Sequence, residues 1–352
     1  MSQYWSDLVH TLQPYVPGEQ PRHVELTKLN TNENPYPPSP RVRAVLDDAA
    51  VDALRLYPDP DSGALKAALA ARAGLAPENV FIGNGSDDVL ALAFMAFFKQ
   101  PEPLRFPDLT YGFYPVYCKL FGIASRIVPL NAAFEVDPAD YAAESGPIVL
   151  PNPNAPTGRA LPLEQLERLL AANRERVVLI DEAYVDFGAE SAVALLAEHP
   201  QLLVVQTFSK SRSLAGLRVG FAYGSAELIA GLERVKDSFN SYPLDRLAQA
   251  GALAALEDED YFRDCIARVM ATREWTVAEL TRRGFAVLPS QTNFVLARVP
   301  NGRARALFEQ LREVGVLVRY FDRPRLHEHL RISIGTDTEM RRLVEEIDRL
   351  LD

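Results

Sequence analysis

The stretch that organises this chain is TFSKSRSLAGLRVG, residues 207–220. An apolar run at 202–205 leads into it and predicts a buried strand that ends near Ser209 and Lys210. A lysine at a strand end, flanked by hydroxyl groups, can form a Schiff base with an aldehyde cofactor. Arg218 and the nearby hydroxyl groups can hold a phosphate. Because most isolated Ser-Lys pairs are solvated loop residues, other parts of the chain must decide between these interpretations.

Length and composition indicate a large folded protein. The chain has 352 residues, of which 48% are hydrophobic, and this suits two domains with a sizeable core. A formal net charge of −10 argues against a nucleic-acid partner and a polybasic membrane patch. Cys118 and Cys265 lie far apart and predict no disulfide framework. We find neither a basic leader nor an apolar run long enough to span a bilayer, so we expect a cytoplasmic protein. The close pair His327 and His329 does not lead us to expect a metal site.

A repeated order of short apolar strand, polar loop and helix begins at residue 80. The strands are expected at 80–82, 104–106, 147–150 and 177–180. This alternation predicts an α/β fold with a mostly parallel sheet flanked by helices. In such sheets the ligand binds beyond the carboxyl ends of the strands, which is where the polar motifs of this chain fall.

The C-terminal third has a different order. A long helical region at 244–283 is expected to break near 257–260. Further strands are expected at 285–288, 293–297, 316–319 and 330–334, with helices at 303–314 and 338–351. This pattern predicts a smaller C-terminal α/β domain. The expected division is an N-terminal arm at 1–30, a large domain at 31–245 and a small domain at 246–352.

Several polar groups follow the strands of the expected sheet. The loop GNGSDD at 83–88 joins a strand to a helix, so its backbone amides form either a phosphate site or a capped turn. Asp181 ends an apolar run and needs a cationic partner, which a protonated pyridine nitrogen could be; an ordinary helix cap or salt bridge is the alternative. Tyr184 could reach the phenolic oxygen of such a ring, and Tyr111 could stack on it.

Together, these motifs resemble the fold-type I pyridoxal-phosphate aminotransferases, and more narrowly the histidinol-phosphate aminotransferase family. The resemblance rests on NPNAPTG at 152–158, DEAY at 181–184 and SKSRSLAGLRVG at 209–220, in this order and spacing. It extends over nearly the whole chain, as far as LRISIG at 330–335. The block with the lysine and the arginine is highly specific, whereas the asparagine-rich loops are less so.

The resemblance implies pyridoxal 5'-phosphate as the cofactor and gives each matching residue a role. Lys210 would hold the cofactor covalently and transfer a proton, and Asp181 would pair with the pyridine nitrogen. Tyr184 would bond the phenolic oxygen, and Tyr111 would stack on the ring. The residues that would hold the cofactor phosphate are Ser86, Asp87, Thr207, Ser209, Arg218 and, from the partner subunit of a homodimer with shared active sites, Tyr57.

One position departs from the family pattern. The family commonly has an asparagine immediately before Pro-Thr-Gly, and its side chain bonds the phenolic oxygen of the cofactor. Here Ala155 holds that place, and Asn154 stands just before it. We therefore predict that Asn154 takes over the role through a shift in the loop.

Two arginines near the C-terminus predict an anion site. Arg319 ends one expected strand and Arg331 opens another, and two guanidinium groups at adjacent strand ends would repel unless an anion lay between them. The resemblance assigns both residues to substrate binding, with Tyr15 from the N-terminal arm and Asn32 closing over the substrate.

The predicted reaction is transamination between histidinol phosphate and 2-oxoglutarate, which gives imidazole acetol phosphate and glutamate in histidine biosynthesis. Aromatic aminotransferases and the threonine-phosphate decarboxylase of cobalamin synthesis have overlapping motifs and remain alternatives. A non-enzymatic alternative is the aminotransferase-like sensor domain of a transcription regulator. Such a regulator would have a basic DNA-binding module ahead of this domain, and residues 1–30 are too short and proline-rich for one.

Overall fold

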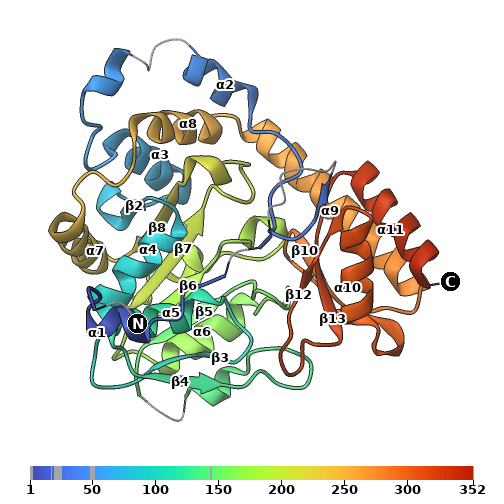
Figure 1. Ribbon diagram of the computed structural model, residues 1–352. Helices are drawn as coiled ribbons and strands as arrows, with labels where there is room; N and C mark the ends of the chain where they lie inside the picture. Colours follow the sequence, from blue (N-terminus) through green and yellow to red (C-terminus); the bar gives the residue numbers. More distant parts are fainter. Residues whose placement is uncertain (1–2, 17, 20–25, 48–51, 143–144, 352) are drawn as a thin grey trace.

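The computed structural model describes residues 3–16, 18–19, 26–47, 52–142 and 145–351. A large part built on a seven-stranded sheet is joined to a smaller C-terminal part built on a four-stranded sheet. Figure 1 shows the smaller part in orange and red beside the large one, with the long helix α9 (Glu259–Arg282) leading into it. Within the described residues, no helix has the length and apolar character needed to cross a membrane.

The large sheet has the strand order β2-β8-β7-β6-β5-β3-β4. Its strands are β2 (Val80–Gly83), β3 (Leu104–Pro107), β4 (Ser125–Val128), β5 (Ile148–Pro151), β6 (Val178–Asp181), β7 (Leu202–Thr207) and β8 (Gly220–Gly224). All neighbours are parallel except that β8 runs antiparallel to both β2 and β7. The predicted mostly parallel sheet is therefore confirmed. Strand β4 was not predicted, because three of its four residues are exposed and form no apolar run.

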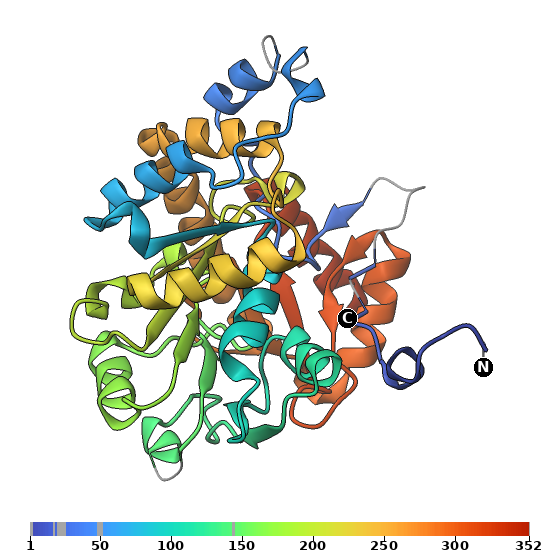
Figure 2. The same ribbon diagram turned by 90° about the vertical axis from the view of Figure 1, so that its left-hand side faces the viewer.

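Both faces of this sheet are buried. In β6, Val178 and Ile180 pack into one apolar core, whereas Leu179 between them packs into another on the opposite face. The first core is shared with helices α2 (Pro40–Asp47), α3 (Gly63–Ala73), α6 (Leu163–Ala172) and α8 (Arg246–Leu256). The second is shared with helices α4 (Ser86–Ala93), α5 (Phe113–Phe121) and α7 (Ala226–Phe239). The view in Figure 2 looks onto the side that carries α4 and α7.

The smaller part has its own core and an antiparallel sheet in the order β12-β13-β10-β9. Its strands are β9 (Ala286–Val287), β10 (Phe294–Arg298), β12 (Arg319–Tyr320) and β13 (His329–Ser333), and its further helices are α10 (Ala304–Glu313) and α11 (Asp337–Leu351). The single strand expected at 316–319 is in fact two. The first piece, β11 (Val316–Leu317), pairs with β1 (Thr27–Lys28) from the N-terminal region, and only the second piece joins the four-stranded sheet.

The packing differs from the predicted domain division at helix α8. Helix α8 was expected in the small domain, but its residues Ala248, Ala252 and Ala255 are buried in the core of the large sheet. The packing therefore changes after Leu256, in the turn that precedes α9. Of the predicted arm at 1–30, the described residues contain the short helix α1 (Asp7–Thr11) and β1; residues 1–2, 17 and 20–25 lie outside the description.

Candidate active site

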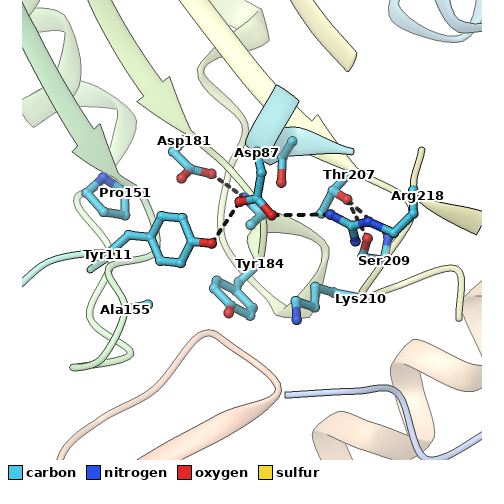
Figure 3. A pocket seen from close by; sticks show the side chains of 12 residues that line it. Asp87, Tyr111, Pro151, Ala155, Asp181, Tyr184, Thr207, Ser209, Lys210 and Arg218 are labelled. Carbon is cyan, nitrogen blue, oxygen red and sulfur yellow. Dashed lines mark hydrogen bonds and ion pairs between the residues drawn. The ribbon is translucent and has the colours of Figure 1, made fainter. Parts of the chain in front are cut away.

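A pocket lies where β5, β6 and β7 end. Their last residues, Pro151, Asp181 and Thr207, all line it, as expected for a parallel sheet. The other lining residues are Ser86, Asp87, Tyr111, Ala155, Ala183, Tyr184, Ser209, Lys210 and Arg218 (Figure 3). The fold thus brings together, from segments far apart in sequence, most of the residues that the motif pattern singled out.

One end of the pocket is a tight cradle at the start of α4. Gly85 precedes this helix with φ of 87°, a left-handed conformation that favours glycine. A Cβ atom on Gly220 would lie 2.2 Å from the backbone nitrogen of Ser86, so only glycine allows β8 to approach this turn. The helix presents its free amide groups here, beside the guanidinium group of Arg218. Such a cradle is suited to an anion.

Hydroxyl groups complete this end. The Thr207 and Ser209 hydroxyls lie 3.0 Å apart, and the Ser209 amide donates to Thr207 Oγ1 over 3.1 Å. Arg218 is held by Asp87, whose Oδ2 accepts a hydrogen bond of 3.2 Å from its Nη2. Asp87 Oδ1 accepts from the Tyr111 hydroxyl over 2.7 Å, which fixes the position of that ring at the pocket wall (Figure 3).

Asp181 provides a buried carboxylate in the wall of the pocket. Its side chain accepts hydrogen bonds from the Tyr114 hydroxyl at 2.9 Å and from the Ala183 amide at 3.2 Å. No cation among the described residues forms an ion pair with it. Burial therefore raises the pKa of Asp181 to about 6, although these hydrogen bonds oppose the shift. A positively charged group that enters the pocket would pair with this carboxylate and favour its ionised form.

Lys210 stands at the opposite side of the pocket from Asp181, just beyond the end of β7. Its Nζ donates to the Thr31 carbonyl oxygen over 3.2 Å and lies 5.9 Å from the centre of the Tyr184 ring. Burial and the nearby charge of Arg331 lower the pKa of Lys210 to about 8, so more of the amine is neutral near pH 7 than for an ordinary lysine. Tyr184 is oriented by Asn32, whose Nδ2 donates to its hydroxyl oxygen over 2.9 Å.

A second pocket adjoins the first and shares Lys210, Tyr184, Tyr111 and Ala155 with it. The four residues predicted for substrate binding, Tyr15, Asn32, Arg319 and Arg331, all line this second pocket.

Arg319 and Arg331 lie directly opposite each other on neighbouring strands. No described carboxylate pairs with either, and Arg331 Nε is buried without a partner. Two like charges at opposed positions of a sheet destabilise it unless an anion compensates them. The pocket is therefore suited to an anionic ligand.

Comparison with known proteins agrees with this arrangement. The family model for aminotransferase class I and II matches residues 24–347. The chain belongs to this aminotransferase family. A protein of Aromatoleum aromaticum named histidinol-phosphate aminotransferase is 58% identical over 355 residues, with 100% of both chains covered. One of Thiobacillus denitrificans, named histidinol-phosphate aminotransferase 2, is also 58% identical and covers 99% of this chain and 98% of its own.

Solved structures show the same fold. The crystal structure of histidinol-phosphate aminotransferase from Sinorhizobium meliloti in complex with pyridoxal-5'-phosphate has a TM-score of 0.90 and 25% identity. The match covers 100% of this chain and 98% of that one. Aspartate aminotransferase from Thermus thermophilus with maleate, at 20% identity and a TM-score of 0.84, shares the fold.

Two residues predicted for the aminotransferase site do not line either pocket. The Asn154 side chain is buried and turned away, because its Nδ2 donates to the Leu109 carbonyl and to Thr157 Oγ1 over 3.0 and 2.9 Å. Ala155 lines the pocket in its place, so the predicted shift of the loop toward the cofactor is absent. Tyr57 is 78% exposed and stacks on Tyr242, with 4.7 Å between ring centres. Within one chain, Tyr57 therefore makes no contribution to the pocket.

The structure also adds residues that sequence reasoning missed. Tyr114 is fully buried and donates to Asp181, and its place one helical turn after Tyr111 was the only available signal. Arg323 lines the second pocket beside Arg319 and Arg331. It lies in a loop after β12 that gave no strand or helix pattern, so sequence reasoning could not place it.

Proposed function

We propose that this aminotransferase transfers an amino group between histidinol phosphate and 2-oxoglutarate, giving imidazole acetol phosphate and glutamate. The observation that carries the proposal is the position of Lys210. Its amine lies where a phosphate-type cradle with a buried carboxylate meets a pocket lined by arginines that no described carboxylate pairs with. The names of the full-length relatives at 58% identity support the same reaction.

The residues present fit pyridoxal 5'-phosphate. A Cβ atom on Gly220 would fill the cradle at the start of α4, and Arg218, Thr207 and Ser209 surround that cradle with donors. Asp181 lacks a cationic partner among the described residues and would gain one in a protonated pyridine nitrogen. These features support the assignment of the phosphate to the cradle and of the ring to the space between Tyr111, Asp181 and Tyr184.

Each residue then has a defined task. When bound, the cofactor supplies an electron sink for the substrate carbon and carries the amino group between the two half-reactions. Lys210 anchors the cofactor covalently and, once freed by the amino substrate, takes and returns a proton at Nζ, for which a pKa near 8 is suitable. Asp181 keeps the ring nitrogen charged, and Tyr184 donates its hydroxyl hydrogen to the phenolic oxygen.

The arginine pocket explains how one site accepts two different substrates. The planar set of N–H donors on a guanidinium group matches the spacing of oxygens in both a phosphate and a carboxylate. Arg319 and Arg331 can therefore hold the phosphate of histidinol phosphate in one half-reaction and a carboxylate of glutamate in the other. Tyr15 from the N-terminal region also lines this pocket, beside Tyr111 and Phe113, with ring centres 6.3 and 4.4 Å away.

A substrate comparison tests the proposal. Purified protein with 2-oxoglutarate should turn over histidinol phosphate, and histidinol should have a kcat/KM at least ~10-fold lower because it loses charge-assisted contacts. Both rates can be followed by glutamate formation. Equal kcat/KM for the two compounds would favour a general aromatic aminotransferase, and release of carbon dioxide from threonine phosphate would favour the decarboxylase.

Replacing Arg331 by alanine should weaken the binding of both substrates. The loss of a charge-assisted contact corresponds to about 1.5–3 kcal/mol, so KM should rise roughly 10- to 150-fold for histidinol phosphate and for glutamate. The cofactor should stay bound, because its proposed contacts are elsewhere. Arg298→Ala is the matched control, since Arg298 lies on the same sheet but pairs with Glu328. A rise in KM for only one substrate would contradict a shared anion pocket.

We also propose a homodimer with shared active sites, in which Tyr57 of the partner subunit reaches the cofactor phosphate. The exposure of Tyr57 in the single chain, beside the half-exposed Tyr242, supports this. Mixing Tyr57→Phe and Lys210→Ala chains should give more activity than either parent has alone, because one site of each heterodimer is then intact. A mixture no more active than its parents would contradict the shared site.

The cytoplasmic location of the protein also remains part of the proposal. So does the division into an arm and two domains, in which the boundary between the two domains now lies in the turn before α9.

A further inference from the structure

A second group of polar side chains lies near the start of strand β7, whereas the active site lies at the end of this strand. Glu167 on α6 and the neighbouring pair Glu198 and His199 bring two carboxylate oxygens and an imidazole nitrogen within 4.8 Å of one another. The pair lies in the turn that enters β7, whose other end leads to Lys210. The strand from Leu202 to Thr207 spans roughly 17 Å at the usual rise per residue.

The imidazole is the unusual member of this group. His199 is only 3% exposed, and both of its ring nitrogens are buried without a hydrogen-bond partner. Buried polar atoms are normally paired, because an unmade hydrogen bond costs about 1–3 kcal/mol. One of these nitrogens faces the two glutamates. A ligand bound between the glutamates would therefore give this nitrogen a partner.

The two glutamates lack a counter-charge. Both side chains are exposed, and neither forms an ion pair or a side-chain hydrogen bond with any described residue. Two carboxylates this close repel each other unless a cation lies between them. In contrast, Glu164 on the same helix pairs with Arg168. The group thus combines an excess of negative charge with an unsatisfied nitrogen donor.

We propose that Glu167, Glu198 and His199 form a binding site for a divalent transition-metal cation such as Zn²⁺. Imidazole with carboxylate is a ligand set that zinc accepts, whereas Ca²⁺ and Mg²⁺ prefer oxygen ligands alone. Zinc bonds of about 2.0–2.2 Å need ligand atoms roughly 3.3 Å apart, and rotation of the exposed glutamates closes the remaining distance. Water fills the fourth position on the solvent side.

The site has a structural task. Gln201 already ties the same turn to α6, because its Nε2 donates to the carbonyl oxygens of Leu170 and Asn173 over 3.1 and 3.4 Å. The cation adds a second tie between α6 and the turn that enters β7. Because a ligand of the folded state stabilises it by mass action, zinc should raise the unfolding temperature. Catalysis, at the far end of the strand, should not depend on it.

The test uses the holoenzyme without an affinity tag, stripped of metal with a chelator. Equilibrium dialysis against Zn²⁺ should give about one tightly held ion per chain, and Zn²⁺ but not Mg²⁺ should raise the unfolding temperature. Loss of a hydrogen bond behind a metal ligand already weakens binding ~10- to 100-fold, so the double variant Glu167→Gln, Glu198→Gln should lose at least this much affinity. Glu164→Gln removes a charge from the same helix and should bind zinc like the wild type.

A variant at the histidine separates metal binding from packing. His199→Phe fills the same space without unpaired nitrogens, so without metal it should unfold at the wild-type temperature or above. Zinc should then give no further rise. Equal zinc binding by the wild type and the double glutamate variant, or an equal zinc-induced rise in His199→Phe, would overturn the proposal. Either result would leave the proposed transamination untouched.

Discussion

Replacing Lys210 by alanine is expected to lower kcat by at least ~10³-fold. A positioned proton-transfer group commonly contributes 10²- to 10⁴-fold, and Lys210 is also the proposed covalent anchor. Among the residues that the structure describes, Lys210 is the one lysine that lines the two pockets. The rate can be measured as glutamate formation, with circular dichroism to show that the fold is kept.

Borohydride reduction of the wild-type protein, followed by peptide mass spectrometry, should place the cofactor on Lys210. Lys119→Ala is a suitable control, because Lys119 is exposed in the last turn of α5 and should leave both labelling and turnover unchanged. Attachment of the cofactor to any other lysine would refute the site assignment. Normal turnover in Lys210→Ala would exclude Lys210 as the base.

The sequence predicted those parts of the fold that follow from local patterns. Apolar runs such as 177–180 identify strands because both faces of the sheet are covered, and all positions along such a strand are buried. The antiparallel direction of β8 could not be predicted, because the direction of a strand depends on the path of the connecting segment and not on residue type. The position of α8 was also missed, since its small alanines fit either core equally well and only the tertiary packing decides between them.

The same distinction applies to the site. Residues at the ends of parallel strands, such as Asp181 and Thr207, could be placed together because parallel strands end at a common edge. The direction of a side chain within a loop could not be predicted in this way. Asn154 was expected to face the cofactor, yet buried hydrogen bonds to Leu109 and Thr157 hold it elsewhere. Likewise, the proposed metal site brings together Glu167 and His199, which lie far apart in the sequence. No spacing of residues in the sequence predicts that they are close.

Replacing the ionised carboxylate of Asp181 by a neutral amide is expected to cause the second large loss of turnover. Asp181→Asn should lower kcat ~10²- to 10³-fold, the size seen when one preorganised electrostatic partner of a reacting centre is removed. The amide has the shape of the carboxylate, and its oxygen can accept from the Ala183 amide while its NH2 donates to the Tyr114 hydroxyl oxygen, so the fold should be kept. It cannot hold a positive charge on the ring nitrogen, and the substrate carbanion therefore loses its electron sink. The measurement is single-turnover kinetics together with the absorbance of the bound cofactor.

The neighbouring residue provides the control for this prediction. Glu182 is equally buried, but its carboxylate accepts from the Ser191 hydroxyl, the Ala192 amide and Gln206, away from the pocket. Glu182→Gln should cost stability, about 1–3 kcal/mol for the disturbed buried hydrogen bonds, while turnover per folded molecule stays near normal. If turnover falls in Asp181→Asn but not in Glu182→Gln, the loss comes from the missing charge beside the ring nitrogen. It then does not come from the general cost of altering a buried carboxylate. If Asp181→Asn turned over at the wild-type rate with unchanged cofactor absorbance, Asp181 would be a structural residue like Glu182.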